Sequence, residues 1–175
     1  MRPGFVLVVG PSGAGKDTVL RLARLTIPDP RLLFTRRVVT RAETAAEAHD
    51  TLDEAGFLAA LADGDFCLHW QAHGLHYGIP ARYAEAARAD AVVVANVSRG
   101  VVAAARGLLP GVTAVEVTAP PAVLAARLAG RGRAEDHAAR LARQGGAAVE
   151  LRILNDTTPE QAAAQLVAHL QERLA

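Results

Sequence analysis

The residues with the clearest chemistry lie in a glycine-rich segment near the N-terminus. The segment reads Gly-Pro-Ser-Gly-Ala-Gly-Lys from position 10 to position 16, and it matches the spacing G-x-x-x-x-G-K directly after an apolar run. Glycines let successive backbone N–H groups point at one anion, and the positive end of a following helix adds to the attraction. The pattern predicts a loop that binds nucleotide phosphates, formed by Gly10, Pro11, Ser12, Gly13, Ala14, Gly15, Lys16, Asp17 and Thr18.

Lys16 differs from every other basic residue of the chain. The sequence holds nineteen basic residues, and the other eighteen are arginines. A GC-rich genome explains a preference for arginine, but it does not explain why the one exception lies in this loop. A flexible ammonium group suits contact with the β- and γ-phosphates better than a planar guanidinium does. Lys16 is therefore predicted to be catalytic.

Asp17 occupies a position where this motif usually carries serine or threonine, whose hydroxyl binds magnesium. A carboxylate oxygen is also a good Mg²⁺ ligand. Farther along, the apolar run 91–95 ends at Asn96, where many enzymes with such a loop have a carboxylate that organises the metal. We predict that this anionic support has moved to Asp17, which leaves Asn96 to bind water or sugar hydroxyls. The simpler alternatives are an acid favoured by the helix dipole at Asp17 and a turn residue at Asn96.

Arginines gather around a glycine hinge between two predicted helices. They belong to the segment Gly130-Arg-Gly-Arg133 and to positions 140 and 143. Arginines on a mobile lid, predicted at about 128–144, can neutralise charge in a transition state and exclude water. Arg131 and Arg140 are predicted to be catalytic for this reason. The alternative is a set of solvated arginines on a helix surface.

A second group of residues suits a phosphorylated acceptor. Arginine forks bind phosphate through two parallel hydrogen bonds, and histidine, tyrosine and asparagine side chains add further hydrogen-bonding groups. Each histidine by itself is more often a surface or packing residue. The predicted acceptor-binding residues are Arg37, Arg41, His49, Tyr77, Asn96 and Arg99, with Arg36, His73 and His76 nearby in the sequence.

The elements that must position these residues alternate along the chain. Apolar runs predict buried strands at 4–10, 91–95 and 112–117 and weaker ones at 32–40, 66–70 and 151–154. Helices are predicted at 16–25, 52–61, 80–88, 120–129, 134–149 and 159–174, and after Ser98 as an N-cap. Phe57, Leu58 and Leu61 are expected on one helix face, and Pro80 in a first helical turn. The alternation predicts an α/β fold with a mainly parallel sheet.

The composition narrows the possible functions. The chain of 175 residues has the size of one domain, and its net charge of +1 gives no sign of nucleic-acid binding. No apolar run is long enough to span a bilayer, and no signal peptide is expected. Cys67 is the only cysteine, so no internal disulfide can form. We expect a cytoplasmic protein without a membrane or nucleic-acid partner; its oligomeric state stays open.

At this point the chain resembles the guanylate kinases. The phosphate loop, the segment Gly64-Asp-Phe-Cys-Leu-His-Trp-Gln-Ala-His-Gly-Leu-His-Tyr-Gly78 and the Arg-Gly lid follow the layout of that family. The resemblance implies a three-layer P-loop kinase fold, 1–175 as a single domain, with an acceptor-binding insertion at about 35–80. The residues that read guanine in that family are replaced by Leu68 and Ile79, and its phosphate-binding tyrosine falls on His49. An apolar Leu68 cannot accept hydrogen bonds from guanine, which makes GMP a poor acceptor.

These substitutions resemble the ribose 1,5-bisphosphate phosphokinases of phosphonate metabolism. The matching segments are 10–17, 35–41, 70–78, 96–99, 131–133 and 154–156. The resemblance implies that ATP, with Mg²⁺, phosphorylates ribose 1,5-bisphosphate to 5-phosphoribosyl 1-diphosphate (PRPP). A small sugar phosphate would then be the partner. Two alternatives stay open: a nucleoside monophosphate kinase, and a noncatalytic guanylate-kinase-like binding module. The same resemblance leaves Asn155 and Asp156 either beside the adenine or in a plain turn.

Overall fold

A five-stranded parallel sheet forms the centre of the protein in the computed structural model, which describes residues 3–42, 49–129 and 148–175. The strand order is β2-β7-β1-β8-β9, and every neighbouring pair is parallel. The strands are β1 (Gly4–Val9), β2 (Leu32–Phe34), β7 (Val92–Asn96), β8 (Thr113–Thr118) and β9 (Leu151–Leu154). The predicted α/β class with a mainly parallel sheet is confirmed.

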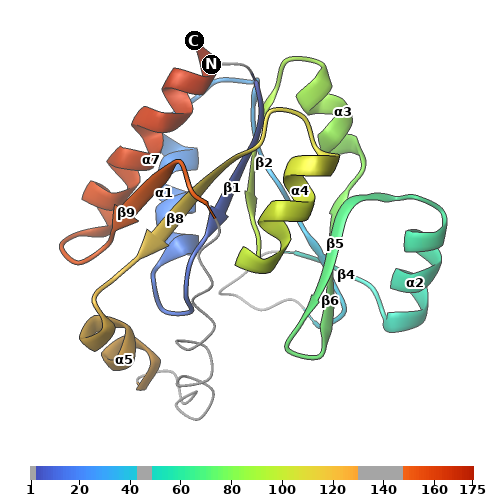
Figure 1. Cartoon of the computed structure of the whole chain (residues 1–175), viewed down its shortest axis with the longest axis horizontal. Coiled ribbons are helices and arrows are strands. Elements are labelled where there is room, and N and C mark those ends of the chain that lie inside the picture. The colour runs from blue at the N-terminus through green and yellow to red at the C-terminus, as the bar shows by residue number, and fades with distance from the viewer. Residues whose placement is uncertain (1–2, 43–48, 130–147) are drawn as a thin grey trace.

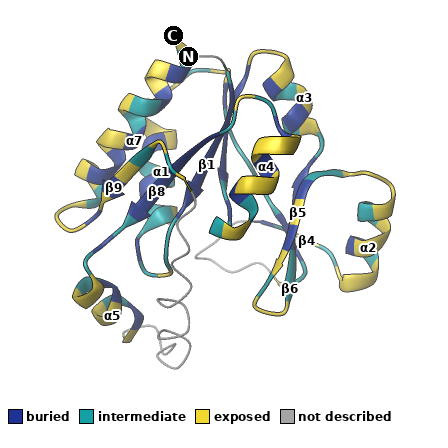
Figure 2. Ribbon diagram, viewed as in Figure 1, coloured by how far each residue is buried: buried dark blue, intermediate teal, exposed yellow. Residues whose placement is uncertain are grey.

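Helices cover both faces of this sheet, which gives three layers (Figure 1). Along β1, Phe5 and Leu7 pack into one apolar cluster while Val6 and Val8 pack into another, because successive strand side chains point to opposite faces. The first cluster contains residues of α3 (Arg82–Arg88) and α4 (Val102–Leu108), and the second contains residues of α1 (Lys16–Thr26), α5 (Pro121–Ala129) and α7 (Pro159–Leu174). The central strands are therefore buried on both sides, as Figure 2 shows.

A second, smaller sheet lies beside the first and carries the segment predicted as an insertion (Figure 1). Its strand order is β4-β3-β6-β5, and its longest pairing is the antiparallel hairpin of β5 with β6. The elements are β3 (Val38–Val39), β4 (Asp50–Thr51), α2 (Glu54–Ala62), β5 (Phe66–Ala72) and β6 (Leu75–Pro80). Asp53 caps α2 by accepting a hydrogen bond from the Gly56 N–H at 2.7 Å.

Two predicted strand and helix boundaries are wrong around this second sheet. The predicted strand 32–40 is divided between β2 in the central sheet and β3 in the small sheet, so residues 35–37 connect the two. Pro80 is the last residue of β6 rather than part of a first helical turn, and α3 begins at Arg82. An apolar run in the sequence indicates that a strand is buried, but it does not indicate which of two sheets the strand joins.

Three further local expectations also need correction or restriction. Leu58 is 49% exposed, so the buried contact of α2 is made by Phe57. Ser98 precedes the short 3₁₀ turn η1 (Arg99–Val101), but its side chain makes no capping hydrogen bond. The predicted helix 134–149 falls mostly outside the described residues, and Ala148 and Val149 are not helical.

The topology brings the chemically important segments to one edge of the central sheet. β1 and β7 are parallel neighbours, and Val8 is paired with Asn96. Because the carboxyl ends of parallel strands meet at one edge, the phosphate loop after β1 lies beside Asn96 at the end of β7. Among the described helices, none is long and apolar enough to cross a membrane.

Candidate active site

The phosphate loop depends on glycine at two positions where neighbouring atoms leave no space for a side chain. Gly10 has a φ of 146°, and a Cβ there would lie 1.9 Å from the Val117 carbonyl oxygen. Gly15 has a φ of 87°, and its Cβ would lie 2.5 Å from Nδ2 of Asn155. Both glycines are therefore required by strained dihedral angles and by close neighbours.

The ammonium group of Lys16 folds back over the loop. It donates hydrogen bonds to the carbonyl oxygens of Gly10 at 2.8 Å and Pro11 at 3.1 Å. Burial lowers the pKa of Lys16 from 10.5 to about 8, the Asp17 carboxylate opposes this shift, and the charges of Arg37 and Arg99 add to it. Burial and neighbouring positive charges disfavour the charged form of this amine. An anion that binds beside it would stabilise that form, so the position suits binding of a polyanion.

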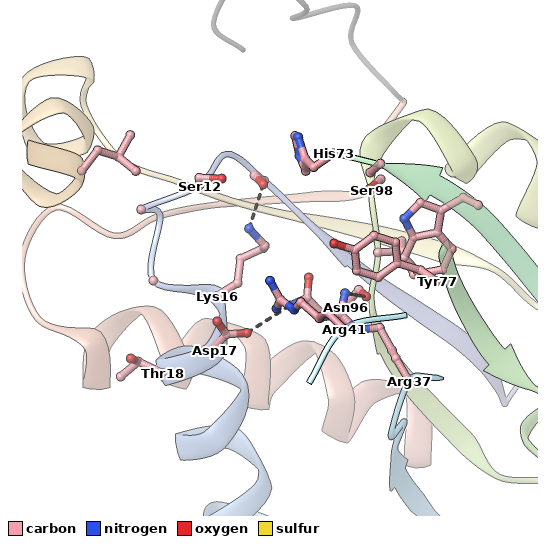
Figure 3. Close-up of a pocket in the computed structure, with 17 residues that line it drawn as sticks. Ser12, Lys16, Asp17, Thr18, Arg37, Arg41, His73, Tyr77, Asn96 and Ser98 are labelled. Carbon is pink, nitrogen blue, oxygen red and sulfur yellow. Dashed lines mark hydrogen bonds between the residues drawn. The ribbon is translucent and has the colours of Figure 1, made fainter. Parts of the chain in front are cut away.

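The loop opens onto a pocket of about 290 Å³ (Figure 3). Its walls combine the phosphate loop, the small sheet and the end of β7. Four of the lining side chains are permanent or potential cations (Lys16, Arg37, Arg41 and His73) and one is a carboxylate, which favours a negatively charged ligand. The lining residues are Gly10, Ser12, Gly13, Gly15, Lys16, Asp17, Thr18, Arg37, Arg41, Trp70, Ala72, His73, Tyr77, Asn96, Val97, Ser98 and Leu128.

Asp17 and Asn96, which both depart from the common motif, are in direct contact. Nδ2 of Asn96 donates a hydrogen bond to Oδ1 of Asp17 at 3.0 Å, and the Asn96 carbonyl accepts one from Nη1 of Arg37 at 2.9 Å (Figure 3). The contact holds the Asp17 carboxylate at the pocket edge. Magnesium in such sites is bound by one or two carboxylates together with substrate phosphates and water, so the Asp17 carboxylate beside a phosphate loop fits the ion.

The far wall of the pocket is aromatic and cationic. Trp70 and Tyr77 are cross-strand partners whose rings stack at 5.3 Å with an angle of 6°. The Arg37 guanidinium lies 5.6 Å from the centre of the Tyr77 ring, and the Tyr77 hydroxyl points into the pocket (Figure 3). Burial lowers the pKa of Arg37, and the nearby positive charge of Arg41 adds to this effect. Both arginines line the pocket on this side.

Two residues predicted to bind the acceptor do not line this pocket. His49 is 1% exposed, and its Nδ1 lies 3.2 Å from the Asp50 carbonyl oxygen. Arg99 forms an ion pair with Glu116, which also pairs with Arg152. Arg36 is directed toward Asp50 and the His49 carbonyl. These contacts depend on the small sheet and on β8, which the linear sequence does not reveal.

The positions that correspond to guanine readers point into the core. Leu68 is 3% exposed and Ile79 is fully buried, and neither lines the pocket. Both belong to the apolar cluster that joins the small sheet to the central sheet. The predicted catalytic residues Arg131 and Arg140 and most of the predicted lid lie outside the described residues, so their roles stay predictions.

Sequence reasoning missed several residues that shape the site. Trp70 forms part of the wall, although the sequence pattern placed it only at the end of a predicted strand. Leu128 lines the pocket from the end of α5. Asn155 does not border the pocket; it is buried beneath the phosphate loop, where its Nδ2 donates to the Ala14 carbonyl at 2.8 Å. No sequence signal connects Asn155 with Ala14, since the contact spans 141 residues.

Comparison with known proteins supports a kinase family assignment. No protein-family profile matches the chain. A protein of Methylobacterium radiotolerans named ribose 1,5-bisphosphate phosphokinase PhnN is 55% identical over 173 residues, which cover 97% of this chain and 98% of that protein. A protein of the same name from Brucella melitensis is 51% identical over 146 residues, covering 81% of this chain and 76% of that protein.

Solved structures agree on the fold. Guanylate kinase from Anaplasma phagocytophilum superposes with a TM-score of 0.69 at 18% identity, covering 99% of this chain and 88% of the other. A sugar kinase from a Janibacter species has a TM-score of 0.54 at 18% identity, covering 99% of this chain and 97% of the other. With the P-loop fold established and high identity over nearly the full length of named relatives, the chain belongs to the ribose 1,5-bisphosphate phosphokinase family.

Proposed function

We propose that the protein transfers the γ-phosphoryl group of ATP to the 1-phosphate of ribose 1,5-bisphosphate, forming 5-phosphoribosyl 1-diphosphate and ADP. The observation that carries this proposal is the pocket itself. A phosphate loop and the pair Arg37 and Arg41 face one another across it, while no polar base reader occupies the positions of Leu68 and Ile79. A sugar with two phosphates matches this distribution of charge and needs no flat base site.

The proposed reaction needs no general base. An oxygen of the acceptor's 1-phosphate is already anionic at neutral pH, so it attacks the γ-phosphorus directly. The bond from that phosphorus to the β,γ-bridging oxygen breaks, and ADP leaves with the electron pair. Catalysis then consists of positioning the two phosphates and neutralising their charge. A missing carboxylate at the end of β7 is consistent with such an acceptor.

Each residue in the pocket has a proposed role in this chemistry. Lys16 binds the β- and γ-phosphates, and its charged form is stabilised when those anions arrive. Arg37 and Arg41 bind acceptor phosphate, and the Tyr77 hydroxyl donates a further hydrogen bond. Asn96 holds Asp17 in place through the 3.0 Å contact. Arg131 and Arg140 are proposed to neutralise transition-state charge.

Asp17 is the proposed protein ligand of magnesium. When bound, Mg²⁺ would screen the charge of the β- and γ-phosphates. The proposal is supported by the exposed position of Asp17 at the pocket and by its contact with Asn96, which occupies the usual place of an acid. His49 and Arg99 stay proposals as acceptor residues, although neither of them lines this pocket.

The test is a product assay with purified protein, Mg-ATP and either ribose 1,5-bisphosphate or a panel of nucleoside monophosphates. ³¹P NMR should show a new diphosphate signal with ribose 1,5-bisphosphate and little transfer to GMP. Transfer to GMP at an equal or higher rate would assign the protein to the nucleoside monophosphate kinases. The absence of transfer to every acceptor would favour a noncatalytic binding module.

A further inference from the structure

Two side chains hold successive carbonyl groups of the phosphate loop from its outer side. Nδ2 of Asn155 donates a hydrogen bond to the Ala14 carbonyl at 2.8 Å, and Nη1 of Arg127 donates one to the Gly13 carbonyl at 3.3 Å. Arg127 also contacts the Asn155 carbonyl through Nη2 at 3.3 Å. The amide and the guanidinium therefore form one connected support, drawn from the end of β9 and from α5.

This support is itself anchored to the central sheet. The backbone N–H of Asn155 donates to the Thr118 carbonyl at 2.7 Å, which continues the pairing of β9 with β8. Asn155 is 2% exposed, so its side chain has little freedom to move. The position of the Ala14 carbonyl is thus tied to two strands rather than to the loop alone.

Holding a carbonyl also sets the direction of the next N–H group. In a planar trans peptide the C=O of one residue and the N–H of the next point in opposite directions, and the described chain has no cis peptide bond. Fixing the Ala14 carbonyl toward Asn155 therefore directs the Gly15 N–H away from it. In the same way, the hydrogen bond from Arg127 to the Gly13 carbonyl fixes the direction of the Ala14 N–H. That N–H donates a hydrogen bond within the loop, to the Pro11 carbonyl at 3.3 Å.

We propose that Asn155 and Arg127 are positioning residues that orient the Ala14–Gly15 peptide so that the Gly15 N–H is aimed at a nucleotide phosphate before the nucleotide binds. An oxyanion gains most from donors that need no reorganisation on binding. The close approach also accounts for Gly15, since a Cβ there would lie 2.5 Å from the Asn155 side-chain nitrogen. The proposal rests on ATP being the phosphoryl donor, and its test therefore measures nucleotide binding separately from acceptor use.

The main variant is Asn155→Leu, which keeps the branched shape of the side chain and removes the donor. Calorimetry with ADP should show a dissociation constant about 10-fold higher, and the KM for ATP should rise in parallel while the KM for the acceptor changes less than about 2-fold. Arg127→Lys should show a smaller effect in the same direction. Gln171→Leu, the same amide-to-leucine change at an exposed position of α7, is the matched control and should bind ADP as the wild type does.

A double-mutant cycle separates positioning from folding. Gly15→Ala should weaken ADP binding strongly in the wild type, and by a smaller factor in the background of a separate Asn155→Ala variant, because the added methyl group then meets no amide. Circular dichroism confirms that each variant is folded. Wild-type ADP affinity in a folded Asn155→Leu variant, or additive effects in the cycle, would overturn the proposal. Failure of the wild type to use ribose 1,5-bisphosphate would refute the proposed acceptor but not this role.

Discussion

Lys16 is the residue whose chemistry can be measured most directly, because it is the only lysine in the chain. Labelling lysine with ¹³C at Cε gives a single side-chain resonance. We expect the pKa of Lys16 measured in the folded protein to be about 8 rather than 10.5, since burial disfavours the ammonium. Adding ADP should raise the midpoint, because phosphates stabilise the charged form.

The lowered pKa of Lys16 also predicts how the free energy of unfolding changes with pH. The folded pKa lies below the unfolded one, so the unfolded chain binds more protons at Lys16 between about pH 8 and 10.5. Stability from this group therefore increases as the pH rises through that window. Lys16→Arg removes the resonance and confirms its assignment. A midpoint near 10.5 in the folded wild type would show that the ammonium is not withdrawn from water.

At Asp17 the prediction concerns the magnesium requirement. Asp17→Asn keeps the shape and removes the charge, so turnover should need more Mg²⁺. Asp17→Ser should recover only part of the activity. Adding Asn96→Asp to that serine variant should improve it, because the two side chains are 3.0 Å apart and serve one site. The measurement is a titration of turnover with magnesium. An unchanged magnesium dependence in Asp17→Asn would show that the carboxylate does not bind the metal and only interacts with the helix dipole.

At the scale of elements, the β5–β6 hairpin forms one wall of the pocket, and its tryptophan can be used to detect binding of the acceptor. Trp70 is the only tryptophan, lines the pocket, and is 7% exposed. Its Nε1 is buried without a hydrogen-bond partner among the described residues. A buried indole N–H usually has a hydrogen-bond partner. An oxygen atom of bound ribose 1,5-bisphosphate is suited to that role.

We therefore expect titration with ribose 1,5-bisphosphate to change the intrinsic fluorescence of Trp70. Trp70→Phe keeps an aromatic ring against Tyr77 and removes the donor. It should raise the KM for the acceptor by about 3- to 10-fold, the range of a neutral hydrogen bond, and leave the KM for ATP within about 2-fold. Trp70→Phe kinetics that match the wild type for both substrates would show that the ring serves packing alone.

At the scale of the whole molecule, the prediction concerns the core that joins the two sheets. Leu68 is 3% exposed and belongs to the cluster that packs the small sheet against the central one. Leu68→Glu restores the residue type found in guanylate kinases, but it places a carboxylate among apolar side chains. We expect the variant to lose about 3–5 kcal/mol of unfolding free energy and to gain no activity toward GMP.

Urea unfolding and a GMP transfer assay test this expectation. Leu68→Met, a swap of similar volume, is the matched control and should cost less than about 1.5 kcal/mol. A stable Leu68→Glu protein that phosphorylates GMP would mean that the acceptor site can be converted by one side chain. The expected outcome is instead that conversion requires repacking the joint between the two sheets.

Much of the fold and the geometry of the phosphate loop could be predicted from the sequence. The spacing of Gly10, Gly15 and Lys16 defines a local backbone geometry, and continuous apolar strands are characteristic of a parallel sheet covered on both faces. Boundaries near the small sheet were less accurate, since the run 32–40 serves two sheets. Hydrophobicity indicates that a segment is buried, but it does not say against which partner.

The sequence alone determined the phosphate loop, its single lysine, the α/β class and the complementary exchange of Asp17 and Asn96. Only the tertiary structure decided that these two side chains touch, that Arg99 pairs with Glu116, and that Asn155 holds the loop from beneath. The physical reason is the range of the interactions. Motif spacing and periodicity act through neighbouring residues, whereas these contacts join strand ends and loops that come together only when the sheet has formed.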